Sequence, residues 1–326
     1  MSLVQKVEIN WKPTTTREAL KLRAKFYAAI RAFFHERDVL EVETPSLCQH
    51  SVTDACINSF KTFYAGVSEK VAYFLQTSPE YAMKRLLAAG SGSIYQIGKA
   101  FRNESQGAYH NPEFSMLEWY RLGFSYHDLM DEVDDFLQVT LGEKKAERNS
   151  YQAIFQDYLN IDPFTVSIDS LQVLAENFSL DNARQYRDRD DLLLFLFSRA
   201  IEPTIGFDAP VFVYDFPATQ AALAKINPKM PHTAQRFEVY IRGLECANGF
   251  DELTHPIEQR KRFEKDNEKR CAHHVEAMKI DERFLSALSH GLPNCSGVAV
   301  GLDRLLMVKA KTKQIRDVIS FPVDIA

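Results

Sequence analysis

Two arginine-containing segments, one around Arg102 and one around Arg304, constrain this sequence more than any other feature. The first reads Phe-Arg-Asn-Glu over residues 101–104, followed by His-Asn-Pro-Glu-Phe over residues 110–114. The second reads Gly-Val-Ala-Val-Gly-Leu-Asp-Arg over residues 297–304. An arginine offers a planar, permanently charged fork that matches phosphate oxygens. Two such forks with carboxylates between them indicate a fold that holds ATP for attack at a phosphate.

We expect the Arg102 segment to join two antiparallel strands. Residues 94–102 and 113–121 have strand character, and residues 103–112 read as the loop between them. Consecutive strands joined by a loop indicate an antiparallel pair. Because side chains alternate between the two faces of a strand, four of them share one face of the second strand. These four are Phe114, Met116, Glu118 and Tyr120, so that this face carries an aromatic ring, a carboxylate and a phenol.

Helical patterns occur on both sides of this strand pair. Apolar residues at helical spacing predict a helix over residues 17–37, and the spacing of Thr15 and Glu18 matches a capping box at its start. The residues expected on the buried face of that helix are Leu20, Tyr27, Ile30 and Phe34. A second amphipathic helix is expected over residues 127–141. The strongly charged residues 256–275 predict a helix with a solvated face.

The C-terminal half returns to strands. Paired strands with helices between them predict an α+β fold, in which helices flank an antiparallel sheet. We treat residues 1–326 as one domain, in which the mostly helical residues 142–208 form an insertion without a motif of their own. The elements expected in the C-terminal half are a strand over 211–216, a hairpin over 237–246 that turns at Arg242-Gly243, a strand over 296–301 and a helix over 302–310.

Composition excludes several other classes of protein. With 326 residues, 45% of them hydrophobic, the chain can bury a full core, and its net charge of −5 argues against a broad basic surface for nucleic acids. The five cysteines are scattered without a Cys-x-x-Cys pair, which favours free thiols over a disulfide framework or a zinc site. No apolar run approaches the roughly 18 residues of a membrane span, and the N-terminus does not read as a signal peptide. We therefore expect a cytoplasmic protein.

The two arginine segments resemble motifs 2 and 3 of the class II aminoacyl-tRNA synthetases, and those of the lysine branch in particular. The resemblance covers nearly the whole chain from about residue 15 and implies the catalytic fold of that family. Taken alone, Arg102 and Glu104 would more often form a salt bridge, and Arg304 would pair with Asp303. The resemblance instead implies that Arg102 contacts the α-phosphate of ATP and the substrate carboxylate, and that Arg304 contacts the γ-phosphate.

The nucleotide site implied by the resemblance is larger than the two arginines. Phe114 is expected to stack on adenine, and Gly301, like Gly297, permits close approach of the backbone. Glu104 and Asn111 are expected to hold adenosine or its phosphates. The full set implied for ATP is Arg102, Asn103, Glu104, His110, Asn111, Phe114, Glu245, Cys246, Gly301 and Arg304.

Two carboxylates are candidates for a magnesium site. Glu238 and Glu245 lie in opposite arms of the expected hairpin, which can bring them together, although a spacing of seven does not by itself indicate metal binding. Mg²⁺ is usually held by one or two carboxylates together with substrate phosphates. Two segments of this chain resemble the corresponding segments of lysyl-type synthetases. They are the Arg-Phe-Glu of residues 236–238 and residues 245–252. The resemblance therefore implies Mg²⁺ on Glu238 and Glu245.

A third group of residues is expected to bind the amino acid. Glu118, Tyr120 and Glu252 together form an anionic, partly aromatic pocket that suits a terminal ammonium, and the family counterpart of Glu80 receives the α-amino group. The substrate should thus be a diamino acid such as lysine. The residues implied for this pocket are Ser78, Pro79, Glu80, Glu118, Tyr120, Asn248, Phe250, Glu252 and Ala299.

The sequence also departs from a lysyl-tRNA synthetase. We expect no anticodon-binding barrel before the core, which argues against tRNA binding. Ala299 stands where the lysyl enzyme has glycine, and Ser78 stands where it commonly has alanine. In both respects the chain resembles the protein-modifying ligases of this family. That resemblance implies an adenylate of (R)-β-lysine, whose β-lysyl group passes to a lysine ε-amino group on elongation factor P.

Two alternatives to this ligase stay open at this point. A minimal lysyl-tRNA synthetase would recognise only the acceptor stem, and an inactive accessory paralogue would have lost one of the charged motif residues, all of which are present. Side chains alone do not separate α-lysine from β-lysine.

The Val-Glu-Thr-Pro string of residues 42–45 fits motif 1, which lies at the dimer interface in the family, so a homodimer is implied.

Overall fold

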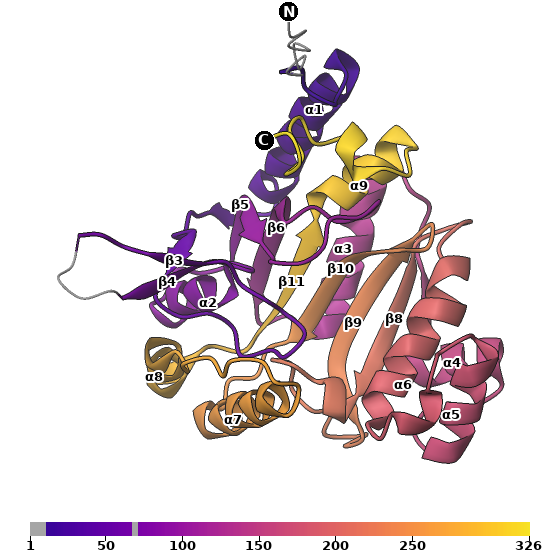
Figure 1. Cartoon of the computed structure of the whole chain (residues 1–326). Helices are drawn as coiled ribbons and strands as arrows, with labels where there is room; N and C mark the ends of the chain where they lie inside the picture. The colour runs from indigo at the N-terminus through magenta and orange to yellow at the C-terminus, as the bar shows by residue number, and fades with distance from the viewer. Residues whose placement is uncertain (1–10, 67–70) are drawn as a thin grey trace, which may run out of the picture.

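The computed structural model describes residues 11–66 and 71–326 and is built on a sheet of eight strands (Figure 1). The strand order is β1-β5-β6-β11-β10-β9-β8-β7. The pairings from β5 through to β8 are antiparallel, whereas the edge strands β1 and β7 pair in parallel. The antiparallel sheet is therefore confirmed, with a parallel pair at each edge. The strands are β1 (Leu40–Glu41), β5 (Ile94–Phe101), β6 (Glu113–Leu122), β7 (Glu147–Ser150), β8 (Val211–Pro217), β9 (Thr233–Ile241), β10 (Leu244–Asp251) and β11 (Cys295–Gly301).

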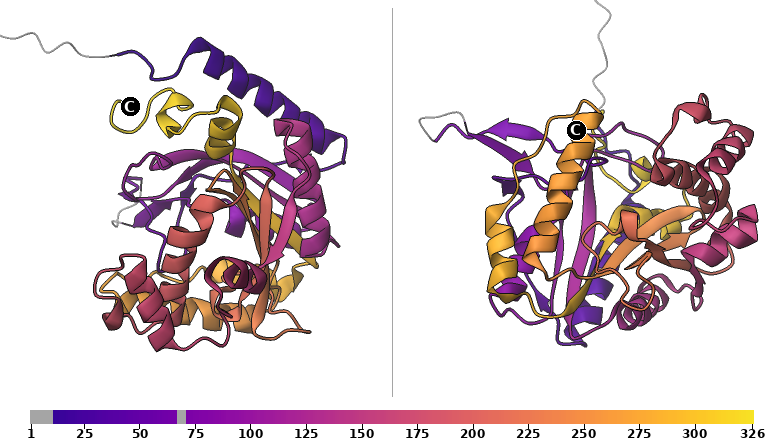
Figure 2. Two further views of the ribbon diagram at one scale, coloured as in Figure 1. Left: turned by 90° about the vertical axis from the view of Figure 1, so that its right-hand side faces the viewer. Right: turned by 90° about the horizontal axis from the view of Figure 1, so that it is seen from below.

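Three helices cover one face of the sheet and enclose the largest apolar core. They are α1 (Arg17–His35), α3 (Tyr126–Leu141) and α9 (Leu302–Ala310), and two of them, α1 and α3, lie together on this side in Figure 2. The core between them and the sheet includes Phe34, Trp119 and Phe136, whose rings pack edge-on or tilted. The helix expected over residues 302–310 is confirmed, and that expected over 127–141 begins one residue earlier.

The start of α1 differs from the expectation in its cap and in its buried face. Thr16, not Thr15, is the last extended residue, and its hydroxyl accepts a hydrogen bond from the Ala19 amide. Leu20, expected on the buried face, is 45% exposed. The fully buried side chains of this helix all lie in its C-terminal half. They are Phe26, Ile30, Phe33 and Phe34.

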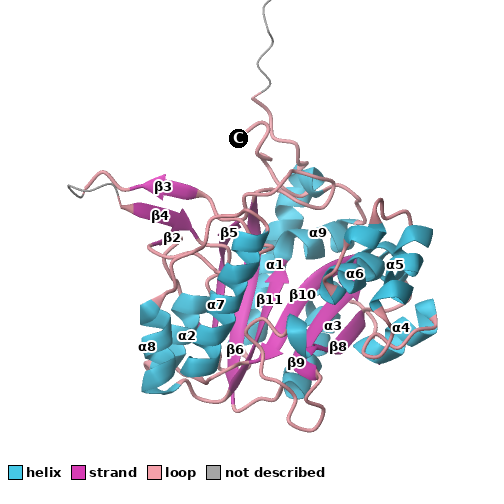
Figure 3. Ribbon diagram, turned by 60° about the horizontal axis from the view of Figure 1, so that its bottom comes forward, coloured by secondary structure: helices cyan, strands magenta, loops and turns pink. Residues whose placement is uncertain are grey.

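The opposite face of the sheet is lined by two groups of helices (Figure 3). At the β5–β6 side lie α2 (Glu80–Ala88), α7 (Pro256–Ala272) and α8 (Glu282–Gly291). A small sheet in the order β2-β4-β3 lies beyond them, formed by Leu47–Cys48, Ala72–Leu75 and Lys61–Phe63. In the part of the chain that the structure describes, no helix has the length and apolar composition to cross a membrane.

The expectation of a solvated α7 is wrong for one of its faces. Phe263 and Arg270 are almost fully buried, although the helix is rich in charges. The Arg270 guanidinium donates hydrogen bonds to the carbonyls of Asp54, Ile57 and Glu276. A charge pattern alone did not reveal this, because two of the three carbonyls come from a loop more than two hundred residues away in the sequence.

Helices from residues 142–208 pack at the β8 end of the sheet. They are α4 (Tyr151–Leu159), α5 (Ile168–Asn177), α6 (Arg189–Leu196) and a π-helical turn at Phe197–Ile201, with short 3-10 turns at Ala183–Gln185 and Glu202–Thr204. A second apolar core joins them to β8. That this segment is an insertion into a single catalytic domain stays a prediction.

The hairpin expected around Arg242 and Gly243 is confirmed, and it determines how the site is presented. Both residues have positive φ (54° and 72°), the pattern of a tight two-residue turn between β9 and β10. The register then shifts between Glu245 and Ala247, a β-bulge on β10. A bulge re-aims the side chains beside it, and this one lies next to Glu245.

Candidate active site

A cavity of about 530 Å³ lies on the face of the sheet opposite α1, α3 and α9. It collects nearly every residue that the sequence pointed to, with Pro79 and Asn103 as the exceptions. Pro79 precedes the first turn of α2, and the Asn103 amide donates to the carbonyl of Asn58. The predicted residues lining it are Ser78, Glu80, Arg102, Glu104, His110, Asn111, Phe114, Glu118, Tyr120, Glu238, Glu245, Cys246, Asn248, Phe250, Glu252, Ala299, Gly301 and Arg304.

One end of the cavity, here called the acid end, is lined by Glu80, Glu118, Tyr120 and Glu252, and the fully buried Lys84 contacts two of these carboxylates from behind. Lys84 was not predicted. Its presence means that Glu80, Glu118 and Glu252 are not all free to bind a ligand. Its ammonium lies 2.6 Å from Glu80 Oε1 and 2.5 Å from Glu252 Oε2, with no exposure to solvent. Two of the expected substrate-binding carboxylates are thus already paired with a cation of the protein.

Glu118 is the carboxylate that remains open. Its Oε1 accepts a hydrogen bond from the Tyr120 hydroxyl (2.6 Å), and its buried Oε2 has no hydrogen-bond partner among the described residues. Burial, and then the neighbouring Glu80 carboxylate, raise the pKa of Glu118 to about 8. An unpaired buried carboxylate oxygen is costly, so this atom suits a ligand that brings a donor or a cation.

The strand register explains why this end needs small residues on β11. Ala299 lies directly across from Glu118 on β6 and from Asn248 on β10, so the three side chains share the cavity face. A Cβ on Gly297 would lie 2.3 Å from the Tyr120 ring and 2.6 Å from Glu252 Oε1. Gly297 is therefore required by packing within the protein, whereas we expected it to serve backbone approach to the nucleotide.

The other end of the cavity, here called the nucleotide end, holds His110, Phe114, Glu238, Glu245 and Arg304. Arg304 does not pair with Asp303, which instead binds Arg23 and the Ser115 amide. Its guanidinium donates to the Glu245 carbonyl (2.6 Å) and lies 2.8 Å from His110 Nε2. Burial, and then the Arg304 charge, lower the pKa of His110, so the ring is a neutral partner for the arginine.

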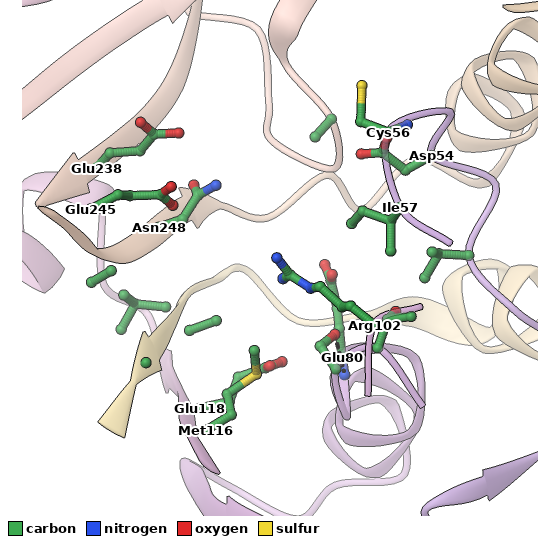
Figure 4. Close-up of a pocket in the computed structure, with 18 of the residues that line it drawn as sticks. Asp54, Cys56, Ile57, Glu80, Arg102, Met116, Glu118, Glu238, Glu245 and Asn248 are labelled. Carbon is green, nitrogen blue, oxygen red and sulfur yellow. Dashed lines mark hydrogen bonds between the residues drawn. The ribbon is translucent and has the colours of Figure 1, made fainter. Parts of the chain in front are cut away.

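Arg102 lies between the two ends. In Figure 4 its side chain extends into the cavity between Glu80 and Glu118 on one side and Glu245 and Asn248 on the other. The guanidinium lies 5.3 Å from the centre of the Phe114 ring, and its buried Nε has no hydrogen-bond partner among the described residues. A cation held at this point can contact a group that bridges the two ends.

Two predicted nucleotide contacts use their side chains elsewhere. Asn111 donates to the Glu113 carbonyl (2.6 Å) and accepts from the Val323 amide (3.1 Å), so its amide group ties the loop to the C-terminal segment. Cys246 is buried in the main apolar core, where its thiol lies 3.4 Å from the Leu244 carbonyl. Any contact between Cys246 and a ligand would therefore be made by the backbone atoms of Cys246.

The hairpin brings Glu238 and Glu245 into one corner of the nucleotide end, beside Asn248 (Figure 4). Glu238 contacts Arg236 and the Tyr240 hydroxyl, and burial, together with the nearby Glu245 carboxylate, raises its pKa. Among the described residues no three acidic, histidine or cysteine side chains gather as a metal site. Two carboxylates, with the unpartnered Oδ1 of Asn248, nevertheless fit Mg²⁺, which completes its shell with phosphates and water.

Other charged residues at the cavity were missed or given no role from the sequence. Lys84 lies one helical turn after Glu80, a spacing that brings side chains together, so it could have been found. Arg236 was noted within a motif but given no role, and its partly buried side chain packs against Phe216 and Glu238. Glu202 comes from the helical segment, and burial beside Glu245 raises its pKa to about 7. No local pattern marks Glu202, because tertiary packing alone brings it to the cavity.

Comparison with known proteins identifies the family of this chain. The family model of class II tRNA synthetases (D, K and N) matches residues 4–325. A protein of Vibrio parahaemolyticus named elongation factor P–(R)-β-lysine ligase is 52% identical over 98% of this chain and its own full length. Proteins of the same name from Avibacterium paragallinarum and Pectobacterium atrosepticum are 51% and 50% identical, each over 97% of this chain and at least 98% of their own length. The chain therefore belongs to the class II tRNA synthetase family, among the relatives named elongation factor P–(R)-β-lysine ligase.

Proposed function

We propose that this protein is an ATP-dependent ligase that activates (R)-β-lysine as an adenylate and transfers the β-lysyl group to a lysine ε-amino group on elongation factor P. The chain is half identical, over nearly its whole length, to relatives that bear this name. The observation in the structure that carries the proposal is the position of Arg102. It extends between an acid end suited to ammonium groups and a nucleotide end suited to phosphates.

In the first step a carboxylate oxygen of β-lysine attacks the α-phosphorus of ATP. The bond from that phosphorus to the bridging oxygen breaks, and pyrophosphate leaves. Arg102 stabilises the negative charge that builds up on the α-phosphate, and Arg304 binds the γ-phosphate. The acid end holds the ammonium groups, so that the carboxylate points towards Arg102. No side chain acts as a nucleophile, and the gain in rate comes from positioning and charge neutralisation.

Mg²⁺ is the metal that this corner would hold, through Glu238 and Glu245. When bound, the ion neutralises phosphate charge and fixes the geometry of the triphosphate. The residues present do the remaining work at this end. Phe114 offers a ring face for adenine, and Arg236 and Tyr240 orient the Glu238 carboxylate.

In the second step the ε-amino nitrogen of the acceptor lysine attacks the carbonyl carbon of the adenylate. The bond from that carbon to the AMP oxygen breaks, the nitrogen loses a proton, and an amide forms. The acceptor must therefore enter the same cavity once pyrophosphate has left. We assign the acceptor as a protein lysine because the relatives are named for this reaction, and we expect no charging of tRNA.

We further propose that the protein acts as a homodimer in the cytoplasm. Glu43, Thr44 and Pro45 of the motif 1 string line a groove together with residues of α2 and α8. Such a groove beside an exposed Leu40 and Leu47 offers a surface for a second copy. Light scattering of the purified protein measures its mass, and a monomer at micromolar concentration would refute the dimer.

The intact mass of elongation factor P tests the proposed function. Incubation with this protein, ATP, Mg²⁺ and (R)-β-lysine should add one lysyl-sized group, and the increase should be slower with α-lysine and absent without ATP. Aminoacylation of lysine tRNA in place of this increase would identify a minimal lysyl-tRNA synthetase. A lack of either product would identify an inactive paralogue.

A further inference from the structure

Lys84 is a fully buried charge that contacts two carboxylates of the acid end without lining the cavity itself. Its side chain has no exposure to solvent, and among the described residues its ammonium forms ion pairs with the carboxylates of Glu80 and Glu252. The ring of Phe284 lies 5.9 Å from the ammonium and belongs to the apolar cluster beneath the acid end. Burial of an ion at this position has a large desolvation penalty unless its partners compensate for it.

The two partners of Lys84 come from distant parts of the chain. Glu80 begins α2, one turn before Lys84, whereas Glu252 follows β10. The ammonium therefore joins a helix to the sheet at the point where both supply a carboxylate to the cavity. Glu252 Oε1 also lies only 2.6 Å from the position that a Cβ on Gly297 would take, so Glu252 is confined from two sides. These contacts leave Glu252 little freedom to reorient.

Lys84 also sets the charge of the acid end. Glu80, Glu118 and Glu252 contribute three carboxylates, and the single ammonium of Lys84 leaves two negative charges when all of them are ionised. Burial favours the neutral acids and raises the pKa of both Glu118 and Glu252 to about 8, although contact with Lys84 opposes this effect at Glu252. The ammonium groups of a bound diamino acid favour the ionised carboxylates, so that two negative charges then meet two positive ones, and the substrate carboxylate lies towards Arg102.

We propose that Lys84 is a positioning residue that determines specificity for a diamino substrate: it holds the Glu80 and Glu252 carboxylates in place and reduces the acid end to the two charges that a diamino acid neutralises. This inference rests on the proposed function. It assigns no contact between Lys84 and the substrate. Its effect passes through the two carboxylates.

The test is the variant Lys84→Met of the full chain, assayed by ATP–pyrophosphate exchange with (R)-β-lysine. Methionine fills a similar volume without the charge, so three carboxylates face one another unneutralised. The KM for β-lysine should rise by about tenfold or more, because the loss of a contact with a charged group weakens binding by about this factor. The KM for ATP should stay within about twofold of the wild-type value. The pH profile of kcat/KM should also move to higher pH, because each carboxylate ionises less readily beside the others.

The matched control is Lys309→Met. Lys309 also lies on a helix with its ammonium near a phenylalanine ring, but it donates to the Thr140 carbonyl, away from the cavity. This control should leave both KM values and the pH profile unchanged. Lys84→Met with wild-type KM and an unshifted pH profile would overturn the proposal. Absence of exchange in the wild-type protein would instead refute the proposed function, so the two failures are distinguishable.

A second variant covers the case in which Lys84→Met does not fold. The double variant Lys84→Met/Glu252→Gln removes one charge of each sign and leaves no unpaired buried ion at that contact. It should fold and should still bind β-lysine at least about tenfold more weakly, since the ordered carboxylate is gone. Wild-type affinity for β-lysine in the folded double variant, measured by calorimetry, would show that the pair serves only the fold.

Discussion

The acid end and the nucleotide end of one cavity are built in opposite ways. At the acid end the side chains of Lys84 and Glu252 are 0% and 1% exposed and are already paired. At the nucleotide end the side chains of Arg304 and Glu245 are 24% and 40% exposed, and the loop of residues 103–110 lies largely at the surface. The difference teaches that amino-acid recognition depends on a buried, preset group of charges. Phosphate recognition depends on charges that remain accessible to solvent until the ligand arrives.

The largest expected effect lies at the nucleotide end. Arg304→Ala removes the cation assigned to the γ-phosphate, and ATP–pyrophosphate exchange should fall by about a thousandfold. The fold should survive, because the guanidinium contacts only the Glu245 carbonyl and His110 among the hydrogen bonds described. The control Arg316→Ala removes an exposed arginine that pairs with Asp324, and should keep full exchange. An Arg304→Ala protein with unchanged exchange would break the assignment of this end to phosphates.

The next effect in size separates the two ends. Glu118→Gln replaces the open carboxylate with a neutral amide, so the KM for β-lysine should rise by about tenfold to a hundredfold while the KM for ATP changes little. The matched control is Glu113→Gln on the same strand, where the carboxylate is half-exposed and pairs with Lys99. Equal losses in both KM values for Glu118→Gln would mean that the two ends are not separate sites of recognition.

The same variant makes a prediction about stability and pH. The pKa of Glu118 is raised from 4.5 to about 8, so the folded protein keeps a proton between these values that the unfolded chain has lost. Stability therefore falls as the pH rises through this window. Glu118→Gln lacks this contribution, and its Tm should fall between pH 5 and pH 8 by about 2–4 °C less than that of the wild type. Calorimetry at the two pH values measures the difference. An identical change of Tm with pH in the two proteins would mean that Glu118 does not have the raised pKa.

The smallest effect concerns the choice between isomers. Ala299→Gly removes a methyl group between Glu118 and Asn248, and the ratio of kcat/KM for α-lysine to that for β-lysine should rise by about tenfold. Ala310→Gly, at the exposed end of α9, is the control for the loss of a methyl group. If the ratio does not move, Ala299 is not a selector, and the acid-end charges alone decide the substrate.

Local patterns in the sequence predicted a large part of this fold. The turn at Arg242-Gly243 and the helix over residues 302–310 were predicted because each depends on neighbours in the chain. The first residue of α1 was predicted, but its capping residue was wrong by one position, since Thr15 and Thr16 are equally good caps locally and packing decides between them. The solvated α7 was wrong because its buried Arg270 depends on carbonyls from a distant loop.

The sequence by itself determined the residue types of the site and the family to which they belong, because the two arginine segments and the glutamate hairpin are contiguous strings. Tertiary structure alone decided which of these groups are free to act. Whether a carboxylate is open, like Glu118, or already paired, like Glu252, depends on the charges that folding brings beside it. Lys84 lies four residues from Glu80 but 168 from Glu252, and only the folded chain turns it from a helix-surface lysine into the buried counter-ion of both.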